Sequence, residues 1–193
     1  VVYQGHVRFV GMPDAVRLIP LETERLRLRL HEPDDSAWLH RIYSQEGVAR
    51  YLLDEPWSLE DAARQVKERL RKTDLNGETG ALAFVIEHDG TPIGSVLLWL
   101  VDSDNRTAEI GWVMDPSFGG RGFAREAAGA VLGLAFDHYK LHRVCARMDA
   151  RNHASAQLAT AVGMKQEAHL RQDWWNKGEW TDTLIFGMLA SDR

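Results

Sequence analysis

The sequence contains a single cysteine, Cys145, so no disulfide can form within the chain. This excludes a disulfide-stabilised secreted fold and favours a reducing compartment. No apolar run approaches the roughly 18 residues that a transmembrane helix needs. The first residues, VVYQGHVRFVGMP, lack the charged and then apolar pattern of a signal peptide. We therefore expect a cytoplasmic protein with no membrane association.

Positive charge is also scarce. The chain has 23 Lys and Arg residues against 28 Asp and Glu residues, a formal net charge of −5. This balance argues against non-specific nucleic-acid binding and against an anionic membrane surface as partner. The eight histidines are scattered, without the carboxylate-supported spacing of a metal site, so no metal is predicted.

The remaining composition is that of an ordinary globular protein. Hydrophobic residues make up 45% and charged residues 26% of the 193 residues. A chain of this length is most simply one domain with a sizeable core. We place the domain at residues 21–193, after an N-terminal extension at residues 1–20 that shows no firm pattern.

Hydrophobic periodicity, caps and turn residues predict an α/β fold with a mixed, mainly antiparallel sheet. Ser58 is a helix N-cap, and Asp89-Gly90 is a strong hairpin turn. We predict helices through 38–43, from 58 to about 72, at 123–139 and at 154–162. The predicted strands begin at 23 and lie at 81–88, 93–101, 107–114, 142–149, 165–174 and 181–189. A helix joins strands 107–114 and 142–149, which should therefore be parallel.

The most informative stretch for function is 109–139. A strand ends at Asp115-Pro116, glycines follow at 119, 120 and 122, and a helix begins at Phe123. The first N–H groups of a helix lack partners and lie at the positive end of its dipole. A glycine-rich turn there favours phosphate binding, and Arg121 and Arg125 add positive charge. A plain tight turn between strand and helix is the simpler alternative.

Two families use such a turn. The dinucleotide fingerprint Gly-x-Gly-x-x-Gly is incomplete, because Arg125 replaces its third glycine and several strands precede the turn. The pyrophosphate loop of the GNAT acyltransferase superfamily, Gln/Arg-x-x-Gly-x-Gly/Ala, maps onto 119–124, with Gly119 in place of the first residue. The preceding strand carries Ala108-Glu109-Ile110, and the predicted order of elements is that of the GNAT fold. The chain therefore resembles a GNAT N-acyltransferase.

The C-terminal half resembles the branch that includes the RimJ/RimL-type acetyltransferases of ribosomal-protein N-termini. The segment LETERLRLR at 21–29 is also typical of that branch, so the resemblance covers roughly residues 21–189. The branch pattern appears, in order, as Asn152-x-x-Ser155, Gly163-Met164, Glu167, Leu170-Arg171, Gly178 and Asp182.

The resemblance implies acetyl-CoA as acyl donor, bound where strands 107–114 and 142–149 splay apart. Backbone groups of Trp112, Val113 and Met114 would pair with the pantetheine arm and direct an N–H at the thioester oxygen, where charge develops in the transition state. Asn152 would hydrogen-bond the arm from the other strand. The pyrophosphate would rest on the segment Gly119, Gly120, Arg121, Gly122, Phe123, Ala124 and Arg125.

Two residues are implied in acyl transfer. Glu109 corresponds to the glutamate that several GNAT enzymes use to take the proton of an amine that is protonated at neutral pH. Its alternative role is a structural pairing with a neighbouring arginine. In many relatives a tyrosine donates to the departing thiolate, at the position where this chain has Ala159. The branch that this chain resembles uses Ser155 for this role instead. Ser155 as a helix cap is the competing interpretation.

The acceptor site is expected near Trp57, in the loop after the first helix, and near Trp174 and Trp175, at the last hairpin. Each tryptophan taken alone is more often a packing residue. Cys145 is interpreted as an inert thiol.

These features predict an N-acetyltransferase that acts on the primary amine of a protein or peptide N-terminus. Acetylation of a small amine, such as an aminoglycoside or polyamine, is the alternative within enzymes of this kind. A non-catalytic acyl-CoA-binding domain and a nicotinamide oxidoreductase are alternatives of other classes. A homodimer is compatible with the sequence, which does not specify the oligomeric state.

Overall fold

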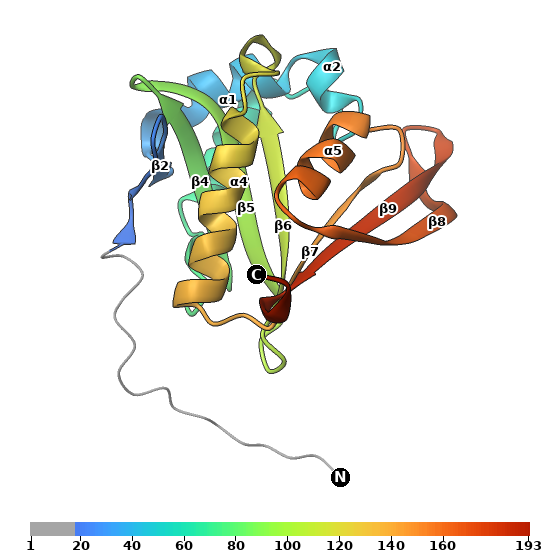
Figure 1. The fold of residues 1–193 in the computed structure, drawn as a ribbon. Helices are drawn as coiled ribbons and strands as arrows, with labels where there is room; N and C mark the ends of the chain where they lie inside the picture. Colours follow the sequence, from blue (N-terminus) through green and yellow to red (C-terminus); the bar gives the residue numbers. More distant parts are fainter. Residues whose placement is uncertain (1–17) are drawn as a thin grey trace.

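The computed structural model describes residues 18–193, so most of the predicted extension at 1–20 lies outside the described residues. In that described part, nine strands form one sheet of order β1-β2-β4-β5-β6-β7-β9-β8, with β3 paired to β4 (Figure 1). The paired strands are antiparallel except for β6 and β7, which are parallel. The predicted α/β fold, with its mainly antiparallel sheet and its parallel central pair, is confirmed.

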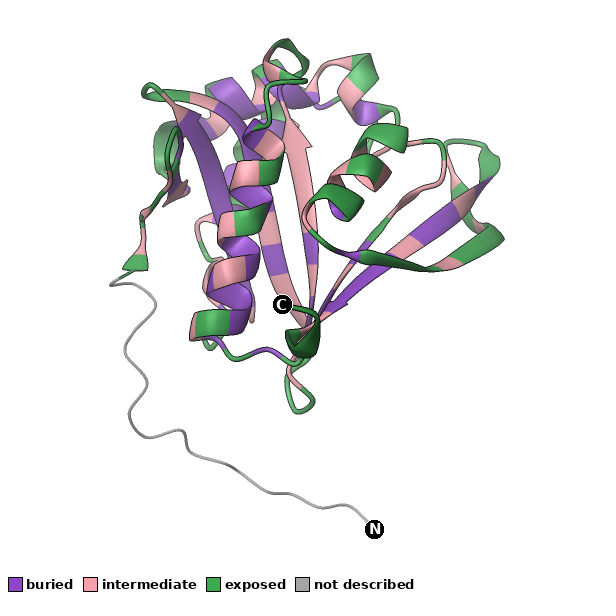
Figure 2. Cartoon of the chain, in the orientation of Figure 1, coloured by how far each residue is buried: buried purple, intermediate pink, exposed green. Residues whose placement is uncertain are grey.

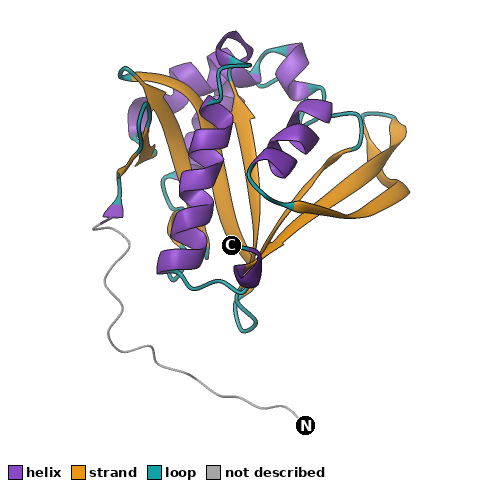
Figure 3. Ribbon diagram, in the orientation of Figure 1, coloured by secondary structure: helices purple, strands orange, loops and turns teal. Residues whose placement is uncertain are grey.

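The strands and helices alternate along the chain much as predicted (Figure 3). The strands are β1 (Leu21–Glu22), β2 (Arg27–Leu30), β3 (Thr73–Asp74), β4 (Ala81–His88), β5 (Thr91–Asp102), β6 (Thr107–Met114), β7 (Arg143–Asp149), β8 (Lys165–Asn176) and β9 (Glu179–Leu189). The helices are α1 (Ser36–Tyr43), α2 (Glu46–Ala49), α3 (Leu59–Arg69), α4 (Phe123–Gly133) and α5 (His153–Ala161). The prediction missed β1, α2 and β3, and it began the strand that contains β2 at 23 instead of 27. It also ran α4 on through Leu134–His138, which is a π-helical turn.

Local hydrogen bonds explain why several elements begin where they do. Ser58 caps α3, because its hydroxyl accepts from the Asp61 amide at 3.1 Å and the Asp61 carboxylate accepts from the Ser58 amide at 3.0 Å. Asp89 and Gly90 both have positive φ, at 49° and 71°, which suits the tight turn between β4 and β5. These are the two signals on which the sequence-based prediction relied.

Helices cover both faces of the sheet and create two apolar layers. On one face, α4 buries Phe123 and Val131 against strand residues such as Ile110. Figure 2 shows the alternation of buried and exposed positions along α4. On the other face, residues of α1 and α3 pack with Trp57 against Val85. None of the helices among residues 18–193 is long and apolar enough to cross a membrane.

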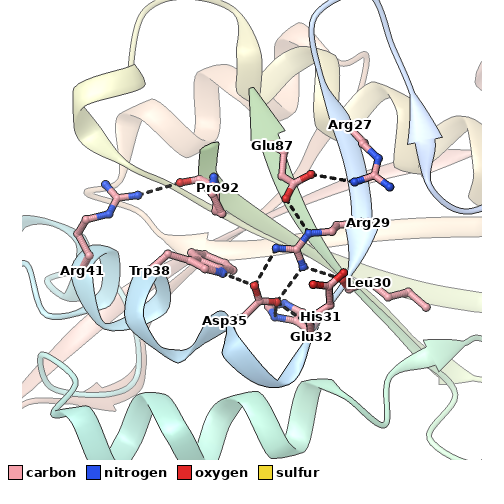
Figure 4. Close-up of polar contacts among 10 residues, drawn as sticks. All are labelled: Arg27, Arg29, Leu30, His31, Glu32, Asp35, Trp38, Arg41, Glu87 and Pro92. Atoms are coloured by element: carbon pink, nitrogen blue, oxygen red, sulfur yellow. Dashed lines mark hydrogen bonds and ion pairs between the residues drawn. The ribbon is translucent and has the colours of Figure 1, made fainter. Parts of the chain in front are cut away.

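A buried ion-pair cluster joins β2, β4 and the start of α1 (Figure 4). The Arg29 guanidinium contacts Asp35 at 2.8 Å and Glu87 at 2.7 Å. Asp35 also accepts a hydrogen bond from Trp38 Nε1 at 2.7 Å. Burial by itself would raise the pKa of Asp35, but the contact with His31 at 3.3 Å and hydrogen bonds from Arg29 and other donors outweigh it and hold that pKa far below its usual range. The cluster therefore fixes α1, and with it one wall of the site described next, to the sheet.

Candidate active site

The parallel pair β6–β7 separates part of the way along its length. Its pairing runs from Thr107–Arg143 to Glu109–Cys145 and then stops, although both strands continue. Figure 1 shows the two strands diverging towards the end of the sheet where α2 and α5 lie. Open sheets commonly hold ligands at the carboxyl ends of such strands.

A cavity of about 480 Å³ occupies part of this opening. It lies between the carboxyl end of β6, the glycine turn, the start of α4 and the start of α5. Of the residues predicted to hold acetyl-CoA, all but Arg121 line it: Trp112, Val113, Met114, Gly119, Gly120, Gly122, Phe123, Ala124, Arg125, Asn152 and Ser155. We refer to it as the donor cavity.

The glycine turn presents bare main chain to the donor cavity. Gly120 and Gly122 have φ of +70° and +81°, a conformation that side chains disfavour. A Cβ built on Gly120 would meet no atom within 4 Å, so the space above this backbone is open. Because Gly122 is also the N-cap of α4, the unpaired N–H groups of the first helical turn follow directly. An anionic diphosphate fits these donors.

A second cavity, of about 350 Å³, lies against the sheet face that α1 and α3 cover. Its walls come from β5, β6, β7, α1, α3 and the loop before α3. The two cavities share six lining residues, Tyr51, Leu52, Trp112, Val113, Asn152 and Ser155. Molecules bound in each would therefore meet beside these residues. A larger and more open hollow of about 790 Å³ along β8 shares no residue with either cavity.

A sequence model of the acetyltransferase (GNAT) domain matches residues 25–165, which is most of the chain. The chain belongs to the GNAT acetyltransferase family. It is 28% identical to an uncharacterized N-acetyltransferase, p20 of Bacillus licheniformis, over 89% of this chain and 97% of that protein. It is 24% identical to the spermidine N(1)-acetyltransferase of Vibrio cholerae over 86% of this chain and 94% of that protein.

The fold is also similar to that of RimL, a ribosomal L7/L12 alpha-N-protein acetyltransferase solved in complex with coenzyme A. The TM-score is 0.78 and the identity 19%, over 89% of this chain and 97% of that one. The family match, not this fold similarity, shows that the GNAT protein is an acyl-CoA-dependent acetyltransferase with acetyl-CoA as its cosubstrate. The narrower RimJ/RimL-type assignment stays a prediction, because the similar proteins include acetyltransferases of two acceptor classes.

Two arginines near the glycine turn of this GNAT domain are engaged elsewhere. The Arg121 guanidinium lies 4.8 Å from the centre of the Phe123 ring, and Arg121 is absent from the lining of the donor cavity. Arg25 donates to the Arg121 carbonyl at 3.0 Å and pairs with Glu126 at 2.7 Å. Arg125 is thus the charged residue in the lining of the donor cavity.

Asn152 and Ser155 have different hydrogen-bond partners. The Asn152 side chain accepts from the Ser155 amide at 3.1 Å and so caps α5. The Ser155 hydroxyl instead accepts from Trp112 Nε1 at 3.2 Å. Because an indole N–H can only donate, the hydroxyl keeps its own hydrogen for another acceptor. The helix-cap role weighed for Ser155 therefore belongs to Asn152.

Glu109 lies at the last paired position of β6 and β7, where the strands begin to separate. Its side chain is half-buried. Burial raises its pKa, and the positive charge of Arg147 opposes that rise. A raised pKa suits a group that must release and take up protons near neutral pH. Glu109 does not line the second cavity, although Gly111 and Val113 on the same strand do.

The predicted tryptophans separate into two groups. Trp57 is buried, stacks on Tyr43 at 4.0 Å between ring centres, and lines the second cavity. Trp174 and Trp175 are 45% and 57% exposed and line neither cavity. A role for these two in binding the acceptor stays a prediction. Cys145 is half-buried, and burial followed by the charge of Glu109 raises its pKa, which keeps the thiol protonated.

Sequence reasoning missed several residues of the second cavity, among them Tyr43, Ser95 and Arg69. Arg69 is the last residue of α3, and the sequence-based prediction of this helix rested on its N-cap, Ser58. The burial of Arg69, at 5% exposure, was the decisive feature and is visible only in the folded chain. The sequence of α3 gave a weak signal, since Val66 and Arg69 are spaced by three residues and lie on one helical face.

Proposed function

We propose that this GNAT enzyme transfers an acetyl group from acetyl-CoA to the primary amine of a protein or peptide N-terminus. One observation carries the proposal: the donor cavity and the second cavity meet at Trp112, Val113, Asn152 and Ser155. The thioester in one cavity and the amine in the other would react there, within a ternary complex. The second cavity is accordingly called the acceptor cavity below.

In the proposed reaction, the neutral amine nitrogen attacks the thioester carbonyl carbon. A carbon–nitrogen bond forms and the carbon–sulfur bond breaks, so the electron pair of that bond leaves with sulfur. The nitrogen loses one proton and the sulfur gains one. Glu109 is suited to take the proton through water, and the free hydrogen of Ser155 is suited to stabilise the departing thiolate. Backbone N–H groups of β6 beside Val113 would stabilise the carbonyl oxygen.

The lining of the acceptor cavity bears on the choice of acceptor. Its charged side chains are Asp54, Arg69 and Arg147. Two arginines against one carboxylate disfavour a polyamine, which brings several positive charges of its own. A peptide N-terminus brings one amine on a neutral or acidic chain, which suits this lining better.

A panel of acceptors tests the proposal. Acetyl-CoA is incubated with peptides that have free or blocked N-termini, with spermidine and with an aminoglycoside, and thiol release is followed with mass analysis of the products. We expect acetylation of free N-termini and none of blocked ones. Faster turnover of spermidine or the aminoglycoside would replace the N-terminal assignment by the small-amine alternative. If acetyl-CoA binds but no amine is acetylated, the proposed function is wrong.

A further inference from the structure

Arg69 is a buried cation inside the acceptor cavity. It is the last residue of α3, is only 5% exposed, and lines the cavity together with Tyr43 and Ser95, which are 3% and 0% exposed. None of these three residues is shared with the donor cavity. They form a part of the acceptor cavity that donor groups do not reach.

The guanidinium of Arg69 has only neutral hydrogen-bond partners. Nη2 donates to Tyr43 Oη at 3.0 Å and Nη1 donates to Ser95 Oγ at 3.3 Å. Nε is buried without a partner. The guanidinium also lies over the rings of Tyr43 and Trp57, at 5.0 and 5.4 Å from their centres. No carboxylate of residues 18–193 lies within ion-pair distance of it.

Another buried arginine of the same chain has the carboxylate partners that Arg69 lacks. Arg29, with a side chain 12% exposed, contacts two carboxylates, Asp35 and Glu87. Burial of a charge is expensive unless an opposite charge and hydrogen bonds accompany it. Arg69 has stacking rings and two hydroxyl oxygens, which are weaker partners than an anion.

The hydroxyl groups beside Arg69 add to the excess of donors. Tyr43 Oη and Ser95 Oγ lie 2.8 Å apart, so one of their two hydrogens is used between them and the other is left over. A guanidinium has five N–H groups, and two of them are used on these oxygens. The group therefore offers three N–H groups and one O–H group and presents no charged acceptor of its own.

The positive charge of Arg69 is not cancelled by an acid of residues 18–193 and acts on its neighbours. Burial and then the charge of Arg69 lower the pKa of Lys72, and the charge of Arg69 also contributes to the lowered pKa of His31, after burial. Within the cavity, Asp54 accepts from Trp57 Nε1 at 3.2 Å, and Arg147 lies 4.0 Å from Asp173. Neither acid forms an ion pair with Arg69.

We propose that the acceptor carries a carboxylate as well as its amine, and that Arg69, with Tyr43 and Ser95, binds this carboxylate. The inference rests on the proposed function, since it concerns the acceptor of the same acetyl transfer. The amine lies beside Val113 and Ser155, and the carboxylate lies at the Arg69 end of the cavity. The carboxylate comes either from a free amino acid or from an acidic side chain near a peptide N-terminus.

Matched acids and amides test the proposal in the full-length enzyme with acetyl-CoA. One series uses glycine, β-alanine and 4-aminobutyrate against their amides, so that chain length also reports the distance from amine to carboxylate. The other series uses C-terminally amidated peptides with Glu or Gln at the first or second position. We expect kcat/KM to favour the acid by about tenfold or more in one series, the usual effect of a hydrogen bond to a charged group. Equal values for acids and amides in both series would overturn the proposal.

Variants at Arg69 test whether this residue causes the preference for acids over amides. Arg69→Met keeps similar length and removes the charge, so the acid should lose its advantage over the amide. Arg69→Lys keeps the charge but loses the planar set of guanidinium donors, so the acid should retain part of its advantage. Arg71→Met is the control, because Arg71 is exposed and pairs with Glu78 on the surface. Each variant must still show the rise in melting temperature with acetyl-CoA. A preference unchanged in Arg69→Met would contradict the assignment.

A binding measurement separates this inference from the proposed function. The N-acetyl forms of the same acids and amides are added to the CoA-bound enzyme, and the melting temperature is recorded. The N-acetyl acids should raise it more than the amides in wild type but not in Arg69→Met. This outcome would support the carboxylate site even if no amine were acetylated. Efficient acetylation of amines with no advantage for acids would leave the proposed function intact and remove the inference alone.

Discussion

At the scale of single residues, the Ser155 hydroxyl gives the simplest distinction between a catalytic role and a structural role. Its oxygen accepts from Trp112 Nε1, and the helix cap is supplied by Asn152. Sequence patterns place both residues at the start of the same helix and cannot divide the two tasks between them. The hydrogen-bond geometry does divide them, and it gives Ser155 a free hydrogen beside both cavities.

We therefore expect Ser155→Ala to lower kcat at least tenfold while changing acetyl-CoA binding less. Asn152→Ala is the matched variant and should lower the free energy of unfolding by about 1 kcal/mol through the lost cap. Steady-state kinetics and urea unfolding of both proteins make the comparison. A Ser155→Ala enzyme with normal kcat and a reduced unfolding free energy would show that Ser155 is structural.

Glu109 offers the second residue-scale test. Glu109→Gln should keep the fold and acetyl-CoA binding, because the amide is nearly isosteric, and should lower kcat/KM by roughly 10²–10⁴-fold. In wild type, burial raises the pKa of Glu109, so the basic form and the activity should appear at a higher pH than for an ordinary glutamate. The defect of the variant should shrink at high pH, where more of the amine is already neutral.

The measurement is kcat/KM against pH for both proteins with the best acceptor. Wild-type activity in Glu109→Gln would place the base elsewhere. Asp173 is then the next candidate, because its Oδ1 is buried without a partner and its carboxylate lies 4.0 Å from Arg147. A defect explained by lost stability would instead favour the structural pairing.

At the scale of elements, the glycine turn between β6 and α4 has a backbone conformation that few residues other than glycine can adopt. Gly122→Val should abolish the rise in melting temperature with acetyl-CoA, because a branched side chain disfavours φ of +81° and crowds Arg25 Nη2 at 3.3 Å. Gly129→Ala in α4 is the control. Gly129 is exposed with no atom near an added Cβ, so this change should leave the ligand effect intact and add about 0.5–1 kcal/mol of stability.

Thermal melts with and without acetyl-CoA compare the two variants. A folded Gly122→Val protein whose melting temperature still rises with acetyl-CoA would remove the glycine turn from the donor site. If Gly122→Val does not fold, Gly120→Val replaces it, since an added Cβ at Gly120 meets no protein atom within 4 Å.

Elements whose signals are local were predictable from the sequence. The Ser58 capping box and the Asp89-Gly90 turn each lie within four residues, and β4 and β6 have the predicted bounds. Short elements such as α2 and β3 were missed, because four or two residues carry too little periodicity. The π-helical turn after α4 was missed because its residues favour an ordinary helix equally well.

The two cavities also differ in how far their residues could be predicted from the sequence. Many donor-cavity residues lie in the contiguous glycine turn and in short motifs that resemble a known family, so their positions could be predicted. Gly47 and Val48 of α2, which also line this cavity, were missed. The acceptor cavity draws Tyr43, Arg69, Ser95 and Arg147 from four separate elements. Only the folded sheet brings these together, and no spacing along the chain indicates it.

At the scale of the whole molecule, the Arg29–Asp35–Glu87 cluster connects the helices of one face to the sheet (Figure 4). Asp35→Asn should lower the free energy of unfolding at pH 7 by about 3 kcal/mol, because it leaves a buried guanidinium short of an opposite charge. Asp137→Asn is the control. Asp137 pairs with Arg193 on the surface, and its side chain is 72% exposed, so that change should be nearly neutral.

The pH dependence gives this prediction its sign. The pKa of Asp35 is lower in the folded than in the unfolded protein, where it is near 3.8. Its stabilising contribution is therefore complete above the unfolded value and is lost as pH falls through the folded value. Urea unfolding at several pH values should show a constant difference between wild type and Asp35→Asn from pH 7 to about pH 5. Below pH 3.8 the difference should narrow. A difference that is already absent at pH 7 would mean that packing, not this ion pair, holds α1 on the sheet.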